Sequence, residues 1–367
     1  MRVRRSVLAV IAAFSTMSGA SFLPVSSAHA TIAPPGGGPD PTSIWVYVNN
    51  VENLMTTYSS STDPIGNDCL GEYTDLPYWM DEHTAPDIFI VQQVGDSGTN
   101  RNGDASVQLN AYLARLKAVL GVDYAGVLAQ RWLTPTTQNC PEKDYQTNAI
   151  IYRTDRFSPV RTSPLTWKSR KGTGCPQVDD QRSINVGQDF FDKVSGKYVA
   201  VASVHWPNSG NGCEALNWDD AVTHVRDPGL KGNLKIIAGD FNIPDRDYPS
   251  MAPKDWWTAA HNDFRDAQYY ACNTAGTDAF DCAQNEGWTA WGQYTLINNV
   301  EVHHRIDFLF AENGDGTLAG MDRSSIQTVS FNDADSAGAD LGNHEDTSPD
   351  TGRYSNHRAV VARMLYP

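Results

Sequence analysis

Short apolar runs that end on polar residues recur along this chain of 367 residues. Several are apolar throughout, as expected of β-strands that are covered on both faces. The strand candidates are Ile44–Val48, Ile88–Val94, Asn148–Tyr152, Tyr198–His205, Leu234–Ala238, Ile306–Phe310 and Ala359–Leu365. Val107–Leu120 places leucines at helical spacing, and Glu214–Arg226 is a second helix candidate. Strands mixed with helices in this way predict a layered α/β or α+β architecture.

The N-terminus has the pattern of a secretory signal peptide. A basic start, Met1–Arg5, precedes a short apolar run and small residues that lead to Ala28-His-Ala30, an A-x-A cleavage site. The apolar run is shorter than the roughly 20 residues that a transmembrane helix needs. We therefore expect a signal peptide over residues 1–30, a Pro/Gly-rich linker over 31–42 and one folded domain over 43–367. The mature protein should be secreted, extracellular and without a transmembrane segment.

All six cysteines follow the expected cleavage site. An even number of cysteines in an exported chain predicts up to three disulfides. Cys272 and Cys282 are close enough in sequence to suggest a local loop closure. A zinc site is disfavoured, because no C-x-x-C or paired-histidine spacing is present.

The chain is acidic, with a net charge of −15 that becomes −18 once the three arginines of the signal peptide are removed. An acidic surface weakens, but does not exclude, binding of a polyanion such as nucleic acid. The basic segment Lys168–Lys171, with Arg161 and Arg182 nearby, could contact phosphate. An ordinary solvated loop is the preferred interpretation of this segment.

The most specific segment is Ile236–Asn242, an apolar run that ends in G-D-F-N. Asp240 and Asn242 lie two residues apart, so they can present a carboxylate and an amide to one phosphate or metal-bound water. A strand cap followed by a turn explains these letters equally well. Three more segments favour the functional interpretation: one run ends on His205, another opens on Asp307, and Ser355-Asn-His357 precedes the last run.

In this chain order, these segments resemble the endonuclease/exonuclease/phosphatase superfamily. That group includes DNase I-like nucleases, neutral sphingomyelinases, inositol polyphosphate 5-phosphatases and the nuclease subunit of cytolethal distending toxin. The resemblance runs from about Ile44 to the C-terminus. It includes Asn50–Leu54, Asp87–Val94 where the family has D-I-x-x-L-Q-E-V, and Asn148–Arg153. It implies an α/β (α+β) fold: a four-layered, DNase I-like sandwich of two packed mixed β-sheets flanked by helices.

The resemblance also implies a role for each matching residue. His357 would activate the attacking water, and Asp307 would orient His357. Asp240 and Asn242 would position that water and a phosphate oxygen, and His205 would contact the phosphate or the leaving oxygen. The expected substrate-binding residues are Asn148, Arg182 and Arg305. The expected residues at the metal end of the cleft are Asn50, Gln93 and Asn356.

Two metal-end residues depart from the family pattern. Gln93 replaces the Glu of L-Q-E-V, and Asn356 replaces the Asp of S-D-H. A third amide, Gln146, stands near where the DNase I branch has a Glu. Because Mg²⁺ and Mn²⁺ favour carboxylate ligands, affinity for either cation should fall. The site could therefore bind metal weakly, act without metal through its histidines and Arg182 or Arg305, or have lost catalysis.

We expect a secreted phosphodiesterase whose substrate is DNA, RNA or a phospholipid headgroup. A nuclease is favoured over a phospholipase C or sphingomyelinase-like hydrolase, and both are favoured over a phosphate-binding pseudoenzyme. Aromatic pairs that could touch a membrane are Trp256-Trp257, Tyr269-Tyr270 and Trp288 with Trp291. Core packing is the preferred interpretation of these pairs. No stable protein partner is indicated, so a monomer is expected.

Overall fold

The computed structural model describes residues 39–51, 75–95, 103–134, 146–208, 212–329 and 357–367, which belong to one compact unit, Ala33–Pro367. The expected signal peptide, most of the linker, Asn356, Cys69 and Cys140 lie outside these residues. None of the described helices is long and apolar enough to span a membrane.

Within the described residues, the first sheet contains six strands in the order β16-β17-β1-β2-β4-β3. Its strands are β1 (Ser43–Asn50), β2 (Ile88–Gly95), β3 (Tyr124–Leu128), β4 (Gln146–Arg153), β16 (Gly320–Val329) and β17 (Ala359–Leu365). β1 is parallel to β2 and antiparallel to β17. The earliest and latest described strands are therefore neighbours in this sheet.

The second sheet follows the order β12-β15-β9-β8-β7-β5, with β6 beside β7. Its strands are β5 (Phe157–Pro159), β6 (Leu165–Lys168), β7 (Ile184–Asp192), β8 (Tyr198–His205), β9 (Leu234–Asp240), β12 (Arg265–Asp266) and β15 (Asp307–Asn313). Two ribbons are separate from it: β10 (Arg246–Asp247) with β11 (Ala252–Pro253), and β13 (Ala290–Ile297) with β14 (Val300–His304).

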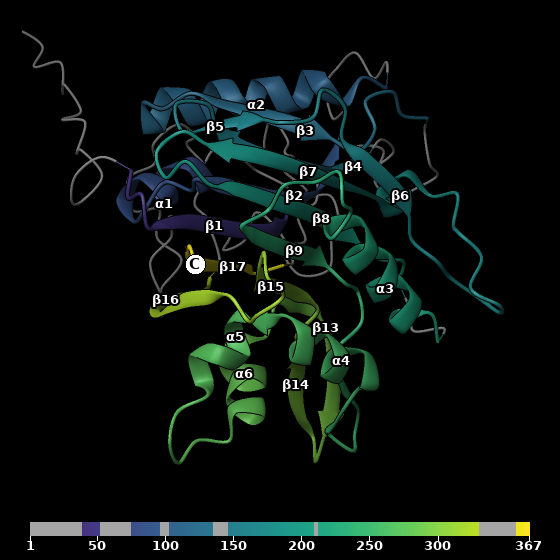
Figure 1. The fold of residues 1–367 in the computed structure, drawn as a ribbon. Helices are drawn as coiled ribbons and strands as arrows, with labels where there is room; N and C mark the ends of the chain where they lie inside the picture. The colour runs from purple at the N-terminus through teal and green to yellow at the C-terminus, as the bar shows by residue number, and fades with distance from the viewer. Residues whose placement is uncertain (1–38, 52–74, 96–102, 135–145, 209–211, 330–356) are drawn as a thin grey trace, which may run out of the picture. The chain divides into compact units, whose positions relative to one another are not determined.

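The helices are α1 (Asp75–Glu82), α2 (Ala105–Leu120), α3 (Glu214–Val225), α4 (Asp255–Asp263), α5 (Ala267–Cys272), α6 (Ala279–Gly287) and a 3₁₀ turn, η2 (Gln181–Ser183) (Figure 1). The two predicted helices are confirmed as α2 and α3. Asp104 caps α2 by accepting a hydrogen bond from the Ser106 amide, and Gly121 ends it in a left-handed conformation.

Successive side chains along each strand point to opposite faces of its sheet, so each sheet contacts the other sheet on one face and helices on the other. On β1, Val46 and Val48 pack in the core between the sheets, together with Ile236 of β9. Tyr47 points the other way, into a cluster with α2. The opposite face of the second sheet packs on α3 and α4 through a third apolar cluster that includes Trp256 and Trp257. The predicted four-layered sandwich is confirmed, and these two tryptophans are core residues.

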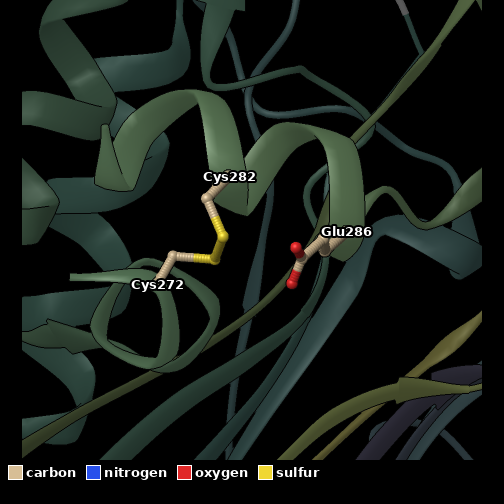
Figure 2. A group of neighbouring side chains, drawn as sticks. All are labelled: Cys272, Cys282 and Glu286. Atoms are coloured by element: carbon tan, nitrogen blue, oxygen red, sulfur yellow. A yellow bond between two sulfur atoms is a disulfide. The ribbon is translucent and has the colours of Figure 1, made fainter. Parts of the chain in front are cut away.

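Two disulfides are present among the described cysteines. Cys272–Cys282 joins α5 to α6, as the short sequence separation predicts, and Figure 2 shows Glu286 beside it. Cys175–Cys213 joins the loop after β6 to the start of α3. Although Cys272, Cys282 and Glu286 are close enough to hold a metal, both sulfurs are already bonded to each other, so neither is a thiolate ligand.

Candidate active site

Strand register brings three predicted residues side by side. His205 pairs with Asp240 across the parallel strands β8 and β9, and Asp240 pairs with Asp307 across the antiparallel strands β9 and β15. Each lies on the face that its strand turns toward the other sheet, in step with core residues such as Val201 and Ile236. The inner apolar rows therefore end in polar groups at one end of the sandwich.

Asp307 and His357 form a buried hydrogen-bonded pair. The distance from His357 Nδ1 to Asp307 Oδ2 is 2.9 Å. A carboxylate acceptor at Nδ1 requires the proton on that nitrogen, which leaves Nε2 as the basic atom. Nε2 lies 3.5 Å from the Asn50 amide nitrogen and 3.8 Å from Asp240 Oδ2. This geometry suits a base that is oriented from behind.

Asp240 lies at the centre of the cluster. Its Oδ1 accepts the Asn242 backbone N–H at 2.7 Å, and its Oδ2 accepts the Asn50 amide at 2.9 Å. His205 Nε2 lies 3.5 Å from the same Oδ2. Asn242 has a φ of 54° and donates its side-chain amide to the Trp206 carbonyl at 2.8 Å. The structure thus brings together Asn50, His205, Asp240, Asn242, Asp307 and His357.

Burial shifts the pKa of two of these groups in ways that favour their neutral forms. Loss of solvent raises the pKa of Asp240 to about 7, with His357 opposing and Asp307 reinforcing the shift. Burial lowers the pKa of His205 to about 3, and the charge of Arg182 acts in the same direction. At neutral pH, Asp240 is near its titration midpoint, and His205 is an uncharged imidazole.

A pH dependence of stability follows for Asp240→Asn. Between about pH 4 and 7, folded Asp240 holds a proton that the unfolded chain has released, so its contribution to wild-type stability falls as pH rises. His205, whose pKa is lowered in the folded protein, makes a contribution to stability that rises with pH. It makes this contribution in both the wild type and the variant. We expect the unfolding free energy of Asp240→Asn, relative to wild type, to rise by about 2 kcal/mol from pH 5.0 to 6.5. Urea unfolding at both pH values measures this, and a constant difference would contradict it.

Gln93, at the expected metal end, is bonded to another amide. It sits at a bulge in the pairing of β2 with β4, with a φ of 60°. Its Oε1 accepts a hydrogen bond from Gln146 Nε2 at 3.0 Å. Two of the amides that replace expected carboxylates therefore pair with each other, and this pair carries no charge.

Asn148 and Arg182 lie next to this pair. The fully buried Asn148 donates to the carbonyls of Arg182 and Ile184, each at 2.7 Å, and its oxygen faces the Gln93 N–H at 3.4 Å. Asn148 thus braces the backbone, which disagrees with the expectation that it binds substrate. Arg182 is 31% exposed and pairs with Asp180 at 2.9 Å, so its guanidinium remains accessible.

Arg305 also disagrees with the expectation of substrate binding. Its guanidinium is fully buried, donates to Asp245 at 2.6 Å and pairs with Asp266 at 2.9 Å. Its third nitrogen also donates to Asp245, at 3.0 Å. Because all three nitrogens face buried carboxylates, Arg305 braces the protein interior. Its partners lie far away in sequence, so no local pattern reveals them.

The donor set fits a divalent cation at one side of the cluster. Ligand atoms of Asp240, Asp307 and His357 all lie within 4.8 Å of one another. Within the described residues, Asp307 Oδ1 is buried and has no hydrogen-bond partner. A bound cation would supply a partner for this carboxylate oxygen. The neutral Gln93 and Gln146 pair adds no charge, so the fit rests on two carboxylates.

The comparisons agree with this architecture. No family model and no curated protein matches the sequence. Among solved structures, an endonuclease/exonuclease/phosphatase from Bacteroides vulgatus is similar over 89% of this chain and 100% of its own, at a TM-score of 0.51 and 15% identity. This chain has the endonuclease/exonuclease/phosphatase fold. A protein of that description from Beutenbergia cavernae gives a TM-score of 0.51 at 12% identity, covering 89% of this chain and 72% of its own.

In this endonuclease/exonuclease/phosphatase fold, a layer of polar contacts beneath the site was not predicted from the sequence. Gln92 Nε2 donates to Ser203 Oγ at 3.0 Å, across the two sheets. Asn185 accepts the His205 backbone N–H at 2.8 Å and fixes the end of β8. Period-two alternation could have found the first contact, because Gln92 and Ser203 share the inner faces of otherwise apolar strands.

Proposed function

We propose that this protein is a secreted phosphodiesterase, with a nuclease as the favoured activity. The observation that carries the proposal is the buried Asp307–His357 pair, in which His357 Nε2 faces Asn50 and Asp240. The four-layered fold supports a phosphoesterase at this end of the sheets. The disulfides support an oxidising, extracellular location.

In the proposed reaction, His357 Nε2 accepts a proton from water as the water oxygen attacks phosphorus. Asp307 stabilises the resulting imidazolium. The bond from phosphorus to the leaving oxygen breaks, and that oxygen takes a proton from His357 or from solvent. His205, uncharged at neutral pH, binds a phosphate oxygen as a hydrogen-bond donor. Asp240, Asn242 and Asn50 hold the water and phosphate in place.

Charge neutralisation at the phosphate is the weaker part of the site. A divalent cation held by Asp240 and Asp307 would stabilise the negative charge that develops on the phosphate. Arg182 can also stabilise this negative charge, because its guanidinium is partly exposed and acts electrostatically on His205. Both routes use the same His357 base.

The proposal is tested with the purified mature protein on plasmid DNA, RNA, bis-p-nitrophenyl phosphate and sphingomyelin vesicles. Each is assayed with Mg²⁺, Mn²⁺, Ca²⁺ or EDTA. Cleavage of any phosphodiester supports the proposal and identifies the substrate class, and cleavage in EDTA favours the metal-free route. Absence of cleavage in every condition would leave a phosphate-binding pseudoenzyme as the better interpretation.

Gln93→Glu tests whether the amide at position 93 weakens binding of a divalent cation. A carboxylate at this position restores a ligand that Mg²⁺ prefers, so the Mg²⁺ concentration for half-maximal activity should fall by about tenfold, and further with Asn356→Asp. Titration of activity with Mg²⁺ measures this, with Gln130→Glu, at a partly exposed position after β3, as the control for added charge. Activity that appears only in the double variant would identify the natural protein as a pseudoenzyme.

A lipid is the second candidate substrate, because the β13–β14 hairpin begins beside the site and carries exposed apolar residues. β13 begins at Ala290, which bridges to His357. In Figure 1 the β13–β14 ribbon extends beyond the two sheets. Its turn is formed by two asparagines with positive φ. The apolar residues Tyr294, Leu296 and Val300 are 46%, 60% and 62% exposed. Exposed apolar groups in one ribbon are typical of an interaction surface.

Replacing both Leu296 and Val300 by aspartate separates the two substrates. For a lipid hydrolase, activity on vesicles should fall by about tenfold or more, because two apolar contacts are lost and two charges gained. Activity on bis-p-nitrophenyl phosphate should be unchanged. Leu216→Asp, at an exposed apolar position on α3, is the control. Equal activity of both variants on vesicles would argue against a lipid-binding hairpin.

A further inference from the structure

Thr289 is a fully buried residue directly before β13. Its Oγ1 accepts two backbone hydrogen bonds, from the N–H groups of Ile306 at 3.0 Å and Asp307 at 2.9 Å. A hydroxyl oxygen has two lone pairs, so both acceptor positions are in use. The side chain of Thr289 therefore fixes the start of β15, where Asp307 begins the strand.

The main chain of Thr289 holds the other member of the pair. Its carbonyl accepts the Arg358 N–H at 2.7 Å, and its own N–H donates to the His304 carbonyl at 3.1 Å. The next residue, Ala290, forms an antiparallel bridge with His357. Thr289 thus contacts both segments that carry the catalytic pair, and these segments are 50 residues apart in sequence.

We propose that Thr289 is a positioning residue that aligns Asp307 with His357, an inference that rests on the proposed phosphodiesterase function. Asp307 opens a strand of the second sheet, whereas His357 precedes β17 of the first sheet. A single hydrogen bond of 2.9 Å joins their side chains, so a small shift between the sheets would break it. Thr289 limits this shift by bonding to both sides at the point where they meet.

The effect of a substitution at Thr289 on kcat should depend on whether the hydroxyl is kept. Valine has nearly the same shape but no acceptor, so Thr289→Val leaves two buried N–H groups unbonded and lets Asp307 move. Serine keeps the hydroxyl, and cysteine offers a weaker acceptor. We expect kcat to decrease in the order threonine, serine, cysteine, valine.

The test is steady-state hydrolysis of bis-p-nitrophenyl phosphate. In Thr289→Val, kcat should fall by about 10–100-fold with KM within about twofold, because alignment is lost and binding is not. Thr289→Ser should return kcat to within about threefold of wild type. Thr258→Val is the matched control, since that exposed hydroxyl donates to the Lys254 carbonyl at the start of α4. If Thr289→Val does not fold, the contrast between serine and cysteine decides.

Amide hydrogen exchange gives a readout that needs no substrate. The Ile306 and Asp307 amides should exchange slowly in wild type and Thr289→Ser, and faster in Thr289→Val or Thr289→Cys. If wild type cleaves no phosphodiester, the proposed function fails while this measurement still tests the anchoring. A wild-type kcat in Thr289→Val, a serine variant as slow as the valine variant, or unchanged exchange at Asp307 would each overturn the proposal.

Discussion

Replacing His357 by alanine should lower kcat on a phosphodiester by about 10²–10⁴-fold, the range typical of a lost general base. The expectation follows from the bond to Asp307 and from the position of Nε2 beside Asn50 and Asp240. KM should change little, because His205 and Arg182 still bind the phosphate. His83→Ala, at an exposed position after α1, is the control for loss of a histidine.

A second variant tests whether His357 and Asp307 act as a unit. Asp307→Ala should cost nearly as much as His357→Ala, and the double variant should be little slower than either, because groups that act together are strongly non-additive. Steady-state kinetics on the three variants measures this. Independent, multiplicative losses would show that Asp307 does not work through His357.

Gly239→Ala should have the largest effect on stability. Gly239 has a φ of 148°, and an added Cβ would lie 1.9 Å from the Val204 carbonyl oxygen of the neighbouring parallel strand. The backbone of β8 or β9 would have to move where it positions His205 and Asp240. We expect the unfolding free energy to fall by about 4 kcal/mol or more, as measured by urea unfolding, together with a loss of activity.

The matched control is Gly196→Ala. This glycine also has a positive φ, of 73°, but nothing lies within 4 Å of the added Cβ. Only the left-handed backbone is penalised there, by about 1–2 kcal/mol. The difference between the variants reports the contact with Val204 together with the higher cost of a φ of 148° than of 73° for an L-residue. Equal losses in both would show that backbone conformation, and not the close approach of the strands, requires glycine at position 239.

Much of the fold could be predicted because its strands are continuous in sequence. The predicted runs Tyr198–His205 and Ala359–Leu365 match β8 and β17 residue for residue. β7 was missed, because Asn185, Gln188 and Asp189 interrupt its apolar residues. These polar side chains are buried and are accommodated by contacts to distant segments. Local periodicity cannot identify such a strand.

The candidate site shows the same division. Residues at strand ends, such as Asp240 and Asp307, could be predicted because each ends or opens an apolar run in the sequence, and the structure pairs the two across β9 and β15. Arg305 could not, because a cation in the sequence does not reveal its partners. Asp245 and Asp266 lie 60 and 39 residues away and meet Arg305 only in the folded chain. The pairing of Gln93 with Gln146 likewise depends on the register of β2 with β4.

The pairing of β1 with β17 has a consequence for biosynthesis. Asn50 ends the earliest described strand, whereas His357 lies two residues before the latest, and the two side chains lie within 3.5 Å. A growing chain therefore contains every other described residue of the cluster before it contains His357, the proposed general base. In the proposed mechanism, hydrolysis therefore cannot begin on the ribosome, and a nuclease with this chain order would stay inactive toward the nucleic acids of the cell that makes it until β17 has been released and has folded.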